Sequence, residues 1–138
     1  MKGTVRAEPC SACPYRQDAP SGLWAHHEYE KLRGYDNPTG DQPWAYFACH
    51  ATPDHLCHGW AVCHTNRGNE FDLLALRIMF PYPAIPESHV PLFDSGNDAA
   101  DHGQRDIHNP SPEAQAAVDR LLRKYPRLQV SDGVQQEE

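Results

Sequence analysis

Residues 49–64 read Cys49-His50-Ala51-Thr52-Pro53-Asp54-His55-Leu56-Cys57-His58-Gly59-Trp60-Ala61-Val62-Cys63-His64. This segment holds three of the five cysteines and four of the nine histidines in the chain. The other two cysteines, Cys10 and Cys13, are separated by two residues, and this spacing lets both sulfurs reach one ion. We therefore expect the two segments to be the two halves of one metal site.

The size and composition of the chain explain why a metal would matter to it. With 138 residues the chain predicts a single domain, and thirteen prolines and a mean hydropathy of −0.73 predict a thin core. A structural metal then adds most, since its binding free energy of about 10 kcal/mol or more becomes folding free energy. We expect the domain to span residues 1–130 and to be followed by a disordered acidic tail at 131–138.

The charge of the chain bears on its partners. The net charge is −7, and residues 35–109 carry ten acidic and three basic side chains. A phosphate backbone needs a basic surface, so nucleic acid is disfavoured as a partner. Another protein is the partner we expect.

The sequence contains no apolar run that resembles a targeting or membrane segment. The N-terminus lacks the apolar core of a signal peptide, and no stretch approaches the roughly 20 apolar residues needed to cross a bilayer. We therefore expect a cytoplasmic protein with no membrane association. In that compartment thiols stay reduced, so clustered cysteines favour metal binding over disulfides.

Apolar periodicity and capping residues predict the secondary structure. We expect a short aromatic strand over 44–48 and helices over 24–33, 70–80, 97–102 and 112–125. Ser21 is a candidate cap for the first helix, and Gly34 stands where that helix would end. Ser111 followed by Pro112 is the clearest helix start. These elements predict a small, irregular α+β domain, stabilised by metal, with three to four helices.

Cysteines lead the predicted ligand set. The first choice is Cys10, Cys13, Cys49 and Cys57, with Cys63 as a substitute or a fifth thiol. His50 and His64 are second-rank candidates, because in an extended chain adjacent side chains point to opposite faces, which favours a supporting role beside the metal. His55 and His58 rank lower. Gly59 is expected to let the backbone pass close beneath the metal.

Zinc is the expected metal, with a [4Fe-4S] cluster as the alternative. Zinc accepts four cysteines, or a mixture of cysteine and histidine, in a tetrahedron. The irregular spacing of the second segment, and the proline directly after Cys13, also fit a cubane cluster held by four thiolates. The spacing leaves both metals open.

Enzymatic functions are the less favoured interpretation. Thiol–disulfide exchange at Cys10 and Cys13 would need a thiolate activated by a helix N-terminus or a cation. Hydrolysis would need an open zinc position and a base, for which Asp54 or Glu70 could serve. Because abundant thiolates favour a closed site, we expect a structural or regulatory module that binds another protein. A nucleic-acid-binding zinc module is the third interpretation.

Several short motifs resemble one known family. They read Cys10-x-x-Cys13-Pro14-Tyr15-Arg16-x-Asp18-x-Pro20-Ser21-Gly22-x-Trp24, Phe47-x-Cys49-His50, Cys57-x-Gly59-Trp60, Cys63-His64, Leu74-Ala75-Leu76-Arg77 and Pro91-Leu92-Phe93-x-Ser95-Gly96. The chain is thus similar to small cysteine-rich proteins of actinobacteria and their phages, which form a domain family of unknown function. The resemblance covers most of residues 8–125. It implies an actinobacterial or phage source and a cytosolic setting, and it carries no established activity.

Overall fold

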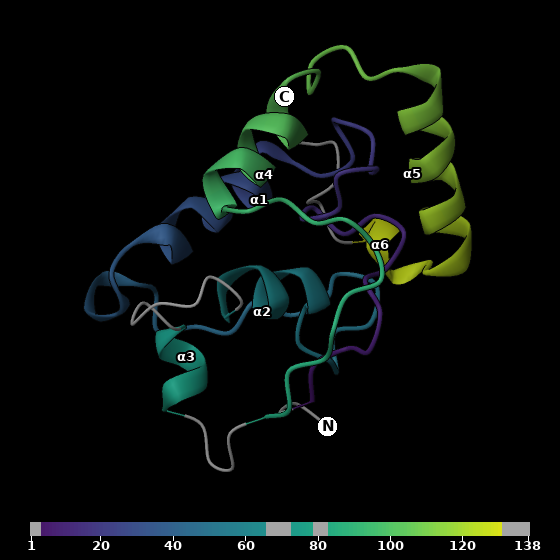
Figure 1. Cartoon of the computed structure of the whole chain (residues 1–138). Coiled ribbons are helices and arrows are strands. Elements are labelled where there is room, and N and C mark those ends of the chain that lie inside the picture. Colours follow the sequence, from purple (N-terminus) through teal and green to yellow (C-terminus); the bar gives the residue numbers. More distant parts are fainter. Residues whose placement is uncertain (1–3, 66–72, 79–82, 131–138) are drawn as a thin grey trace.

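Short helices joined by long irregular segments make up the described part of the chain. The computed structural model describes residues 4–65, 73–78 and 83–130. In chain order (Figure 1) the helices are α1 (His26–Glu30), the 3-10 helices η1 (Lys31–Asp36) and η2 (Thr39–Asp41), α2 (His58–Thr65), α3 (Leu74–Arg77), α4 (Gly96–Gln104), α5 (Pro112–Lys124) and α6 (Arg127–Val130).

The described residues form no regular strand. Their strand-like pairing consists of three isolated bridges, which join Val5 to Leu56, Arg16 to Leu92 and Ala48 to Leu56. The predicted strand over 44–48 is wrong, since Ala48 makes its only bridge, and Trp44 and Tyr46 are 76% and 48% exposed. The predicted α+β class is therefore not supported, and the chain is a small, mainly helical single domain.

The first predicted helix differs from its expected form at both ends. It begins at His26, after Ala25, whose side chain makes no capping hydrogen bond, and it continues as η1 through Gly34 to Asp36. The hydroxyl of Ser21 does not cap it. That hydroxyl instead donates to the carbonyl of Gly103 and accepts from the N–H of Asp106. Ser21 thus ties the start of the chain to the end of α4.

Helix α4 packs closely against α1 and η1. The close approach requires glycine at both ends, because a Cβ at Gly96 would overlap the Leu32 carbonyl and one at Gly103 would overlap the Tyr29 ring. The Ser95 hydroxyl caps α4 by accepting from the N–H of Asp98. The predicted helix over 97–102 is confirmed, and it extends through Gly103 instead of ending there.

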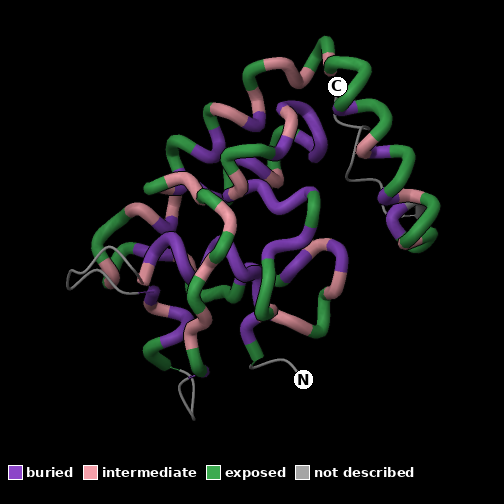
Figure 2. Tube along the Cα trace, turned by 45° about the vertical axis from the view of Figure 1, so that its right-hand side comes forward, coloured by how far each residue is buried: buried purple, intermediate pink, exposed green. Residues whose placement is uncertain are grey.

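Helix α5 follows the predicted pattern closely. The Ser111 hydroxyl accepts from the N–H of Ala114, Pro112 occupies the first turn, and the helix ends at Lys124 before Tyr125. Its buried residues, Ala114, Val118 and Leu121, lie on one face, while most of its other residues are exposed (Figure 2). The predicted amphipathic helix is therefore confirmed.

Helix α2 is the element that the sequence did not predict. Every residue from His58 to His64 is buried, so the helix has no polar face and no amphipathic period. Within the predicted helix over 70–80, the described residues form α3, which begins after the extended Leu73. Residues 66–72 and 79–82, and the predicted tail at 131–138, lie outside the described residues.

Candidate metal centre

The first half of the site is a tight turn. The N–H of Cys13 donates to the carbonyl of Cys10 at 3.0 Å, and the N–H of Arg16 donates to the carbonyl of Cys13 at 3.1 Å. Pro9 and Pro14 flank the pair, and proline stiffens such a turn by fixing φ. Both cysteines of the turn line one cavity, as the spacing predicts.

The second half is a loop that folds back on itself. The N–H of Cys49 donates to the carbonyl of His55, and the N–H of Cys57 donates to the carbonyl of Phe47. These bonds bring the two cysteines to the same end of the loop, although seven residues separate them. Leu56 also pairs with the first described residues, since its N–H donates to Thr4 and its carbonyl accepts from Arg6.

The four thiols predicted as first-choice ligands meet around one cavity. The sulfurs of Cys13 and Cys57 are 3.8 Å apart, and the thiol of Cys10 is hydrogen-bonded to that of Cys49. The cavity measures about 10 Å³, close to the space that one water molecule needs. It is lined by Cys10, Ala12, Cys13, Pro14, Trp24, Cys49, His50, Cys57 and His58.

Cys63 does not line this cavity. It lies on α2, one helical turn beyond Gly59. It is also close to Tyr15: burial raises the pKa of the Tyr15 phenol, and the charge of a Cys63 thiolate raises that pKa further. Cys63 is buried, at 6% exposure. The structure therefore groups four of the five predicted thiols around the cavity and leaves Cys63 outside its lining.

The start of α2 rests directly on two of the sulfurs. The N–H of Trp60 donates to the sulfur of Cys57 at 3.5 Å, and the N–H of Gly59 donates to that of Cys13. A Cβ at Gly59 would lie 2.7 Å from the Cys13 sulfur and 2.5 Å from the Tyr15 Cβ. The predicted close passage of the backbone at Gly59 is thus confirmed. Amide donors at a helix start stabilise thiolates.

Within each thiol pair the two groups differ in acidity. The hydrogen bond from Cys10 lowers the pKa of Cys49 to about 4, with further bonds from Thr52 and Arg6, and the same pairing raises the pKa of Cys10. The hydrogen bond from Cys57 lowers the pKa of Cys13, whereas burial raises that of Cys57. Within each pair one thiol is therefore the more acidic partner: Cys49 in the first pair and Cys13 in the second.

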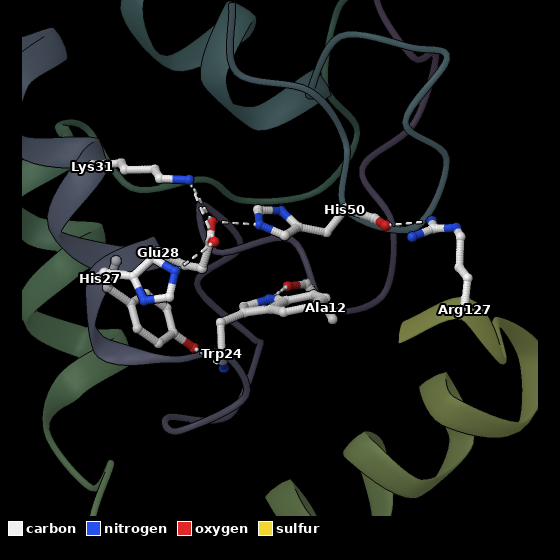
Figure 3. Close-up of polar contacts among 8 residues, drawn as sticks. Ala12, Trp24, His27, Glu28, Lys31, His50 and Arg127 are labelled. Atoms are coloured by element: carbon white, nitrogen blue, oxygen red, sulfur yellow. Dashed lines mark hydrogen bonds and ion pairs between the residues drawn. The ribbon is translucent and has the colours of Figure 1, made fainter. Parts of the chain in front are cut away.

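Two of the four histidines in the segment make hydrogen bonds away from the thiols. Nε2 of His50 lies 2.8 Å from Glu28, whose carboxylate also pairs with Lys31, and the His50 ring packs on Trp24 (Figure 3). Nε2 of His64 lies 3.0 Å from the Tyr15 hydroxyl. His50 lines the cavity and packs on Trp24, while its Nε2 is paired with Glu28. His64 is hydrogen-bonded to the Tyr15 hydroxyl.

The third histidine, His58, lies at the cavity itself. It is 1% exposed and lines the cavity beside the four cysteines. Its Nδ1 is 2.9 Å from the carbonyl oxygen of Arg6, and its Nε2 has no hydrogen-bond partner among the described residues. Sequence reasoning ranked His58 low because no spacing rule singles it out. His55 does not line the cavity.

A larger groove adjoins the cavity. It has a volume of about 580 Å³ and is lined by Glu28, Lys31, Tyr35, Pro43, Ala45, Tyr46, Phe47, Ala48, Cys49, His50, Pro53, Arg127 and Leu128. One wall is fixed by Arg127, whose guanidinium donates to the carbonyls of His50 and Ala51 at 2.6 Å (Figure 3 shows the first of these bonds). Cys49 and His50 line both the groove and the cavity.

The donor chemistry fits a thiophilic ion, although the side chains are arranged as two hydrogen-bonded pairs. No three His, Cys, Asp or Glu side chains in residues 4–65, 73–78 and 83–130 are arranged to hold one metal as they stand. An ion would displace thiol protons on binding, since thiolates are the binding form. Neither Asp54 nor any other carboxylate lines the cavity, and Glu70 lies outside the described residues.

Comparison with known proteins places the chain in one family. The sequence profile of a family of unknown function matches residues 5–123. No curated protein and no solved structure matches the chain. The predicted resemblance to a family of unknown function is thereby confirmed, while the actinobacterial or phage source stays a prediction. None of the helices in the described part of the chain is long and apolar enough to cross a membrane.

Proposed function

Since the chain belongs to the family of unknown function DUF6283, we propose its function from its own residues. It is a small cytoplasmic zinc protein, and the zinc joins the N-terminal turn to the loop before α2. The ligands are Cys10, Cys13, Cys49 and Cys57. The zinc holds the fold together, and the protein acts by binding another protein.

The observation that carries this proposal is the convergence of four buried thiols on a cavity of about 10 Å³. The Cys13 and Cys57 sulfurs are 3.8 Å apart. A regular tetrahedron with Zn–S bonds of about 2.3 Å has an S–S edge of about 3.8 Å. In a cubane cluster each thiolate binds a different iron, so the thiolates stand further apart. The spacing of this pair therefore favours one zinc ion over a [4Fe-4S] cluster.

The surroundings of the site support a structural role. Four thiolates fill a tetrahedral zinc and leave no open position for a substrate. Among the described residues, backbone pairing between the N-terminal part of the chain and the loop before α2 is sparse, and it consists of the pairing of Leu56 with Thr4, Val5 and Arg6. A metal bound at this point would hold together two segments that a β-sheet holds together in other folds.

The groove supports a role in binding. It is wide enough for a few side chains of a partner, and the chain beside it exposes Trp44 and Tyr46. Aromatic residues are enriched at protein interfaces, and exposing them costs a monomer solubility. Together with the net charge of −7, this surface favours a protein partner over nucleic acid.

Elemental analysis of the protein after anaerobic purification tests the metal. We expect about one zinc per chain and no visible absorption, since zinc has a filled d shell. A brown protein with stoichiometric iron and sulfide would show that the alternative cluster is present.

A variant pair then tests the ligands. We expect Cys10→Ser combined with Cys49→Ser to abolish zinc binding and lower the melting temperature. Cys63→Ser is the matched control, because this buried cysteine does not line the cavity, and it should retain a full equivalent of zinc. Unchanged melting of a metal-free double variant would refute the clamp.

A further inference from the structure

His58 presents a metal-binding nitrogen to the cavity. Its Nδ1 lies 2.9 Å from the carbonyl oxygen of Arg6. A carbonyl only accepts, so Nδ1 carries the proton and Nε2 of the neutral ring carries a lone pair. That Nε2 is buried and has no hydrogen-bond partner in the described residues. A buried acceptor without a partner loses its hydration with nothing in return, which calls for an explanation.

The placement of His58 matches that of a zinc ligand. Histidine ligands usually donate their other ring N–H to a carbonyl or a carboxylate, which fixes the tautomer and aims the free nitrogen at the metal. His58 has this arrangement already, and it lines the same cavity as the four cysteines. Four cysteines, His50 and His58 line the cavity. Because Nε2 of His50 is already paired with Glu28, His58 is the fifth donor available to an ion, whereas tetrahedral zinc takes four.

Cys49 is the donor most able to leave the metal. Of the four cysteines at the cavity it alone also lines the groove, so a molecule in the groove reaches it first. Its sulfur also has partners other than a metal. The Arg6 guanidinium lies 3.6 Å from this sulfur, and it is held there by the Thr52 hydroxyl at 3.3 Å. Cys10 is more exposed than Cys49, at 8% against 3%, but it does not line the groove, and Cys13 is held beneath Gly59.

We propose that His58 is a reserve ligand, which binds the zinc through Nε2 when an electrophile in the groove has modified Cys49. The inference rests on the proposed zinc site. With an alkylating agent, the Cys49 sulfur forms a bond to carbon and the leaving group departs. The Zn–S bond breaks because a thioether is a poor zinc ligand, and a Zn–N bond to His58 forms. No electron is transferred, and zinc remains bound by three cysteines and one histidine.

The consequence is a site that senses a thiol-directed electrophile without losing its metal. Modification puts a new group on the floor of the groove, where a partner would bind, while the exchanged ligand preserves the clamp between the two cysteine segments. A site with four cysteines alone would release its zinc under the same modification, so the two arrangements are distinguishable.

Iodoacetamide and a zinc-responsive chelating dye test the exchange on the zinc-loaded full chain. With one equivalent of reagent we expect peptide mass spectrometry to find the label mainly on Cys49, and the dye to detect little released zinc. In His58→Gln the same labelling should release about one zinc per label. The control His55→Gln, a histidine that does not line the cavity, should behave like the unmodified sequence.

Equal zinc release with and without His58, or labelling that begins at another cysteine, would overturn the inference. A protein purified without zinc would instead overturn the proposed function, so the two failures are distinct. If His58→Gln does not fold, the variant Cys49→Ser decides. Loaded with Co²⁺, it should keep one metal, lose about a quarter of its thiolate charge-transfer intensity and show a metal-bound Nε2 resonance for His58. A metal-free Cys49→Ser, or a His58 resonance unchanged by metal, would refute the exchange.

Discussion

Gly59 is the residue at which packing and metal chemistry meet. Its N–H faces the sulfur of Cys13, and it has no room for a side chain. The helix α2 can therefore begin against the turn of Cys10 and Cys13 only if residue 59 lacks a Cβ. The motif Cys57-x-Gly59-Trp60 thus combines a ligand, a close approach and a buried aromatic side chain.

We predict that Gly59→Ala lowers the free energy of unfolding by about 3 kcal/mol, because overpacking a filled site forces the backbone apart. The variant should also bind less than one equivalent of zinc. Urea unfolding and elemental analysis measure the two effects. Gly40→Ala is the control, since a Cβ there meets nothing within 4 Å, and it should leave both quantities nearly unchanged. Two variants of equal stability would contradict the close approach.

Glu28 links the groove to α1 through charge. The hydrogen bond from His50 lowers the pKa of Glu28 to about 2, against an ordinary value of 4.5, and Lys31 adds to this effect. Because the folded-state pKa is the lower one, the carboxylate stabilises the fold above pH 4.5. That stability is lost as the pH falls from there through 2.

We predict that Glu28→Gln costs about 1–2 kcal/mol at pH 7, after allowance for solvent screening of this half-buried group. The cost should shrink as the pH falls below 4.5, because the wild-type carboxylate then becomes protonated in the unfolded chain. Urea unfolding of both proteins between pH 7 and pH 3 measures it. The exposed Glu87→Gln serves as the control and should show no such trend. A cost independent of pH would rule out the charge effect.

At the scale of elements, the helices divide by how much of their stability is local. Helix α5 carries its own start signal in Ser111 and Pro112 and its own apolar stripe. Helix α2 has no polar face, because all of its residues except Thr65 are buried. Its sequence also carries no local start signal of the kind that Ser111 and Pro112 give α5. Its existence depends on the segments that surround it.

We predict that Ser111→Ala destabilises the protein by about 1 kcal/mol, because the N–H of Ala114 loses its capping acceptor. Ser111→Asp keeps an acceptor at this position and should restore most of the loss. Urea midpoints of the three proteins measure the effect. Zinc content should be equal in all three, since α5 contributes no side chain to the cavity. A loss of zinc with Ser111→Ala would contradict this separation.

At the scale of the whole molecule, one cluster of thiols joins parts of the chain that are far apart in sequence. The buried core includes residues from Val5 to Leu128, but long-range backbone pairing among the described residues is sparse. Aromatic side chains fill the space around the cavity, and Trp24 donates its indole N–H to the carbonyl of Ala12. The four thiols and these rings therefore form one unit.

We predict that a strong zinc chelator removes the cooperative thermal transition, because a zinc contribution of about 10 kcal/mol is comparable to the whole stability of a small domain. The near-ultraviolet circular dichroism of the buried Trp24 and Trp60 should fall with it. Adding zinc back under reducing conditions should restore both signals. A chelated protein with the same melting curve would contradict the structural role of the metal.

The sequence by itself determined the features that depend on short-range chemistry. The two residues between Cys10 and Cys13, the cap at Ser111 and the close approach at Gly59 were all predictable, because each follows from local geometry. The sequence also ranked Cys10, Cys13, Cys49 and Cys57 ahead of Cys63, and these four line the cavity, whereas their role as ligands stays a prediction.

Only the tertiary structure decided which distant groups meet. The strand over 44–48 fails because no segment pairs along its length, and α2 forms because other segments bury it on all sides. His58 becomes a candidate ligand only when the carbonyl of Arg6, 52 residues away, fixes its tautomer. The local sequence determines the chemistry that a side chain offers. Long-range packing determines which other groups that side chain contacts, and this packing depends on the whole chain.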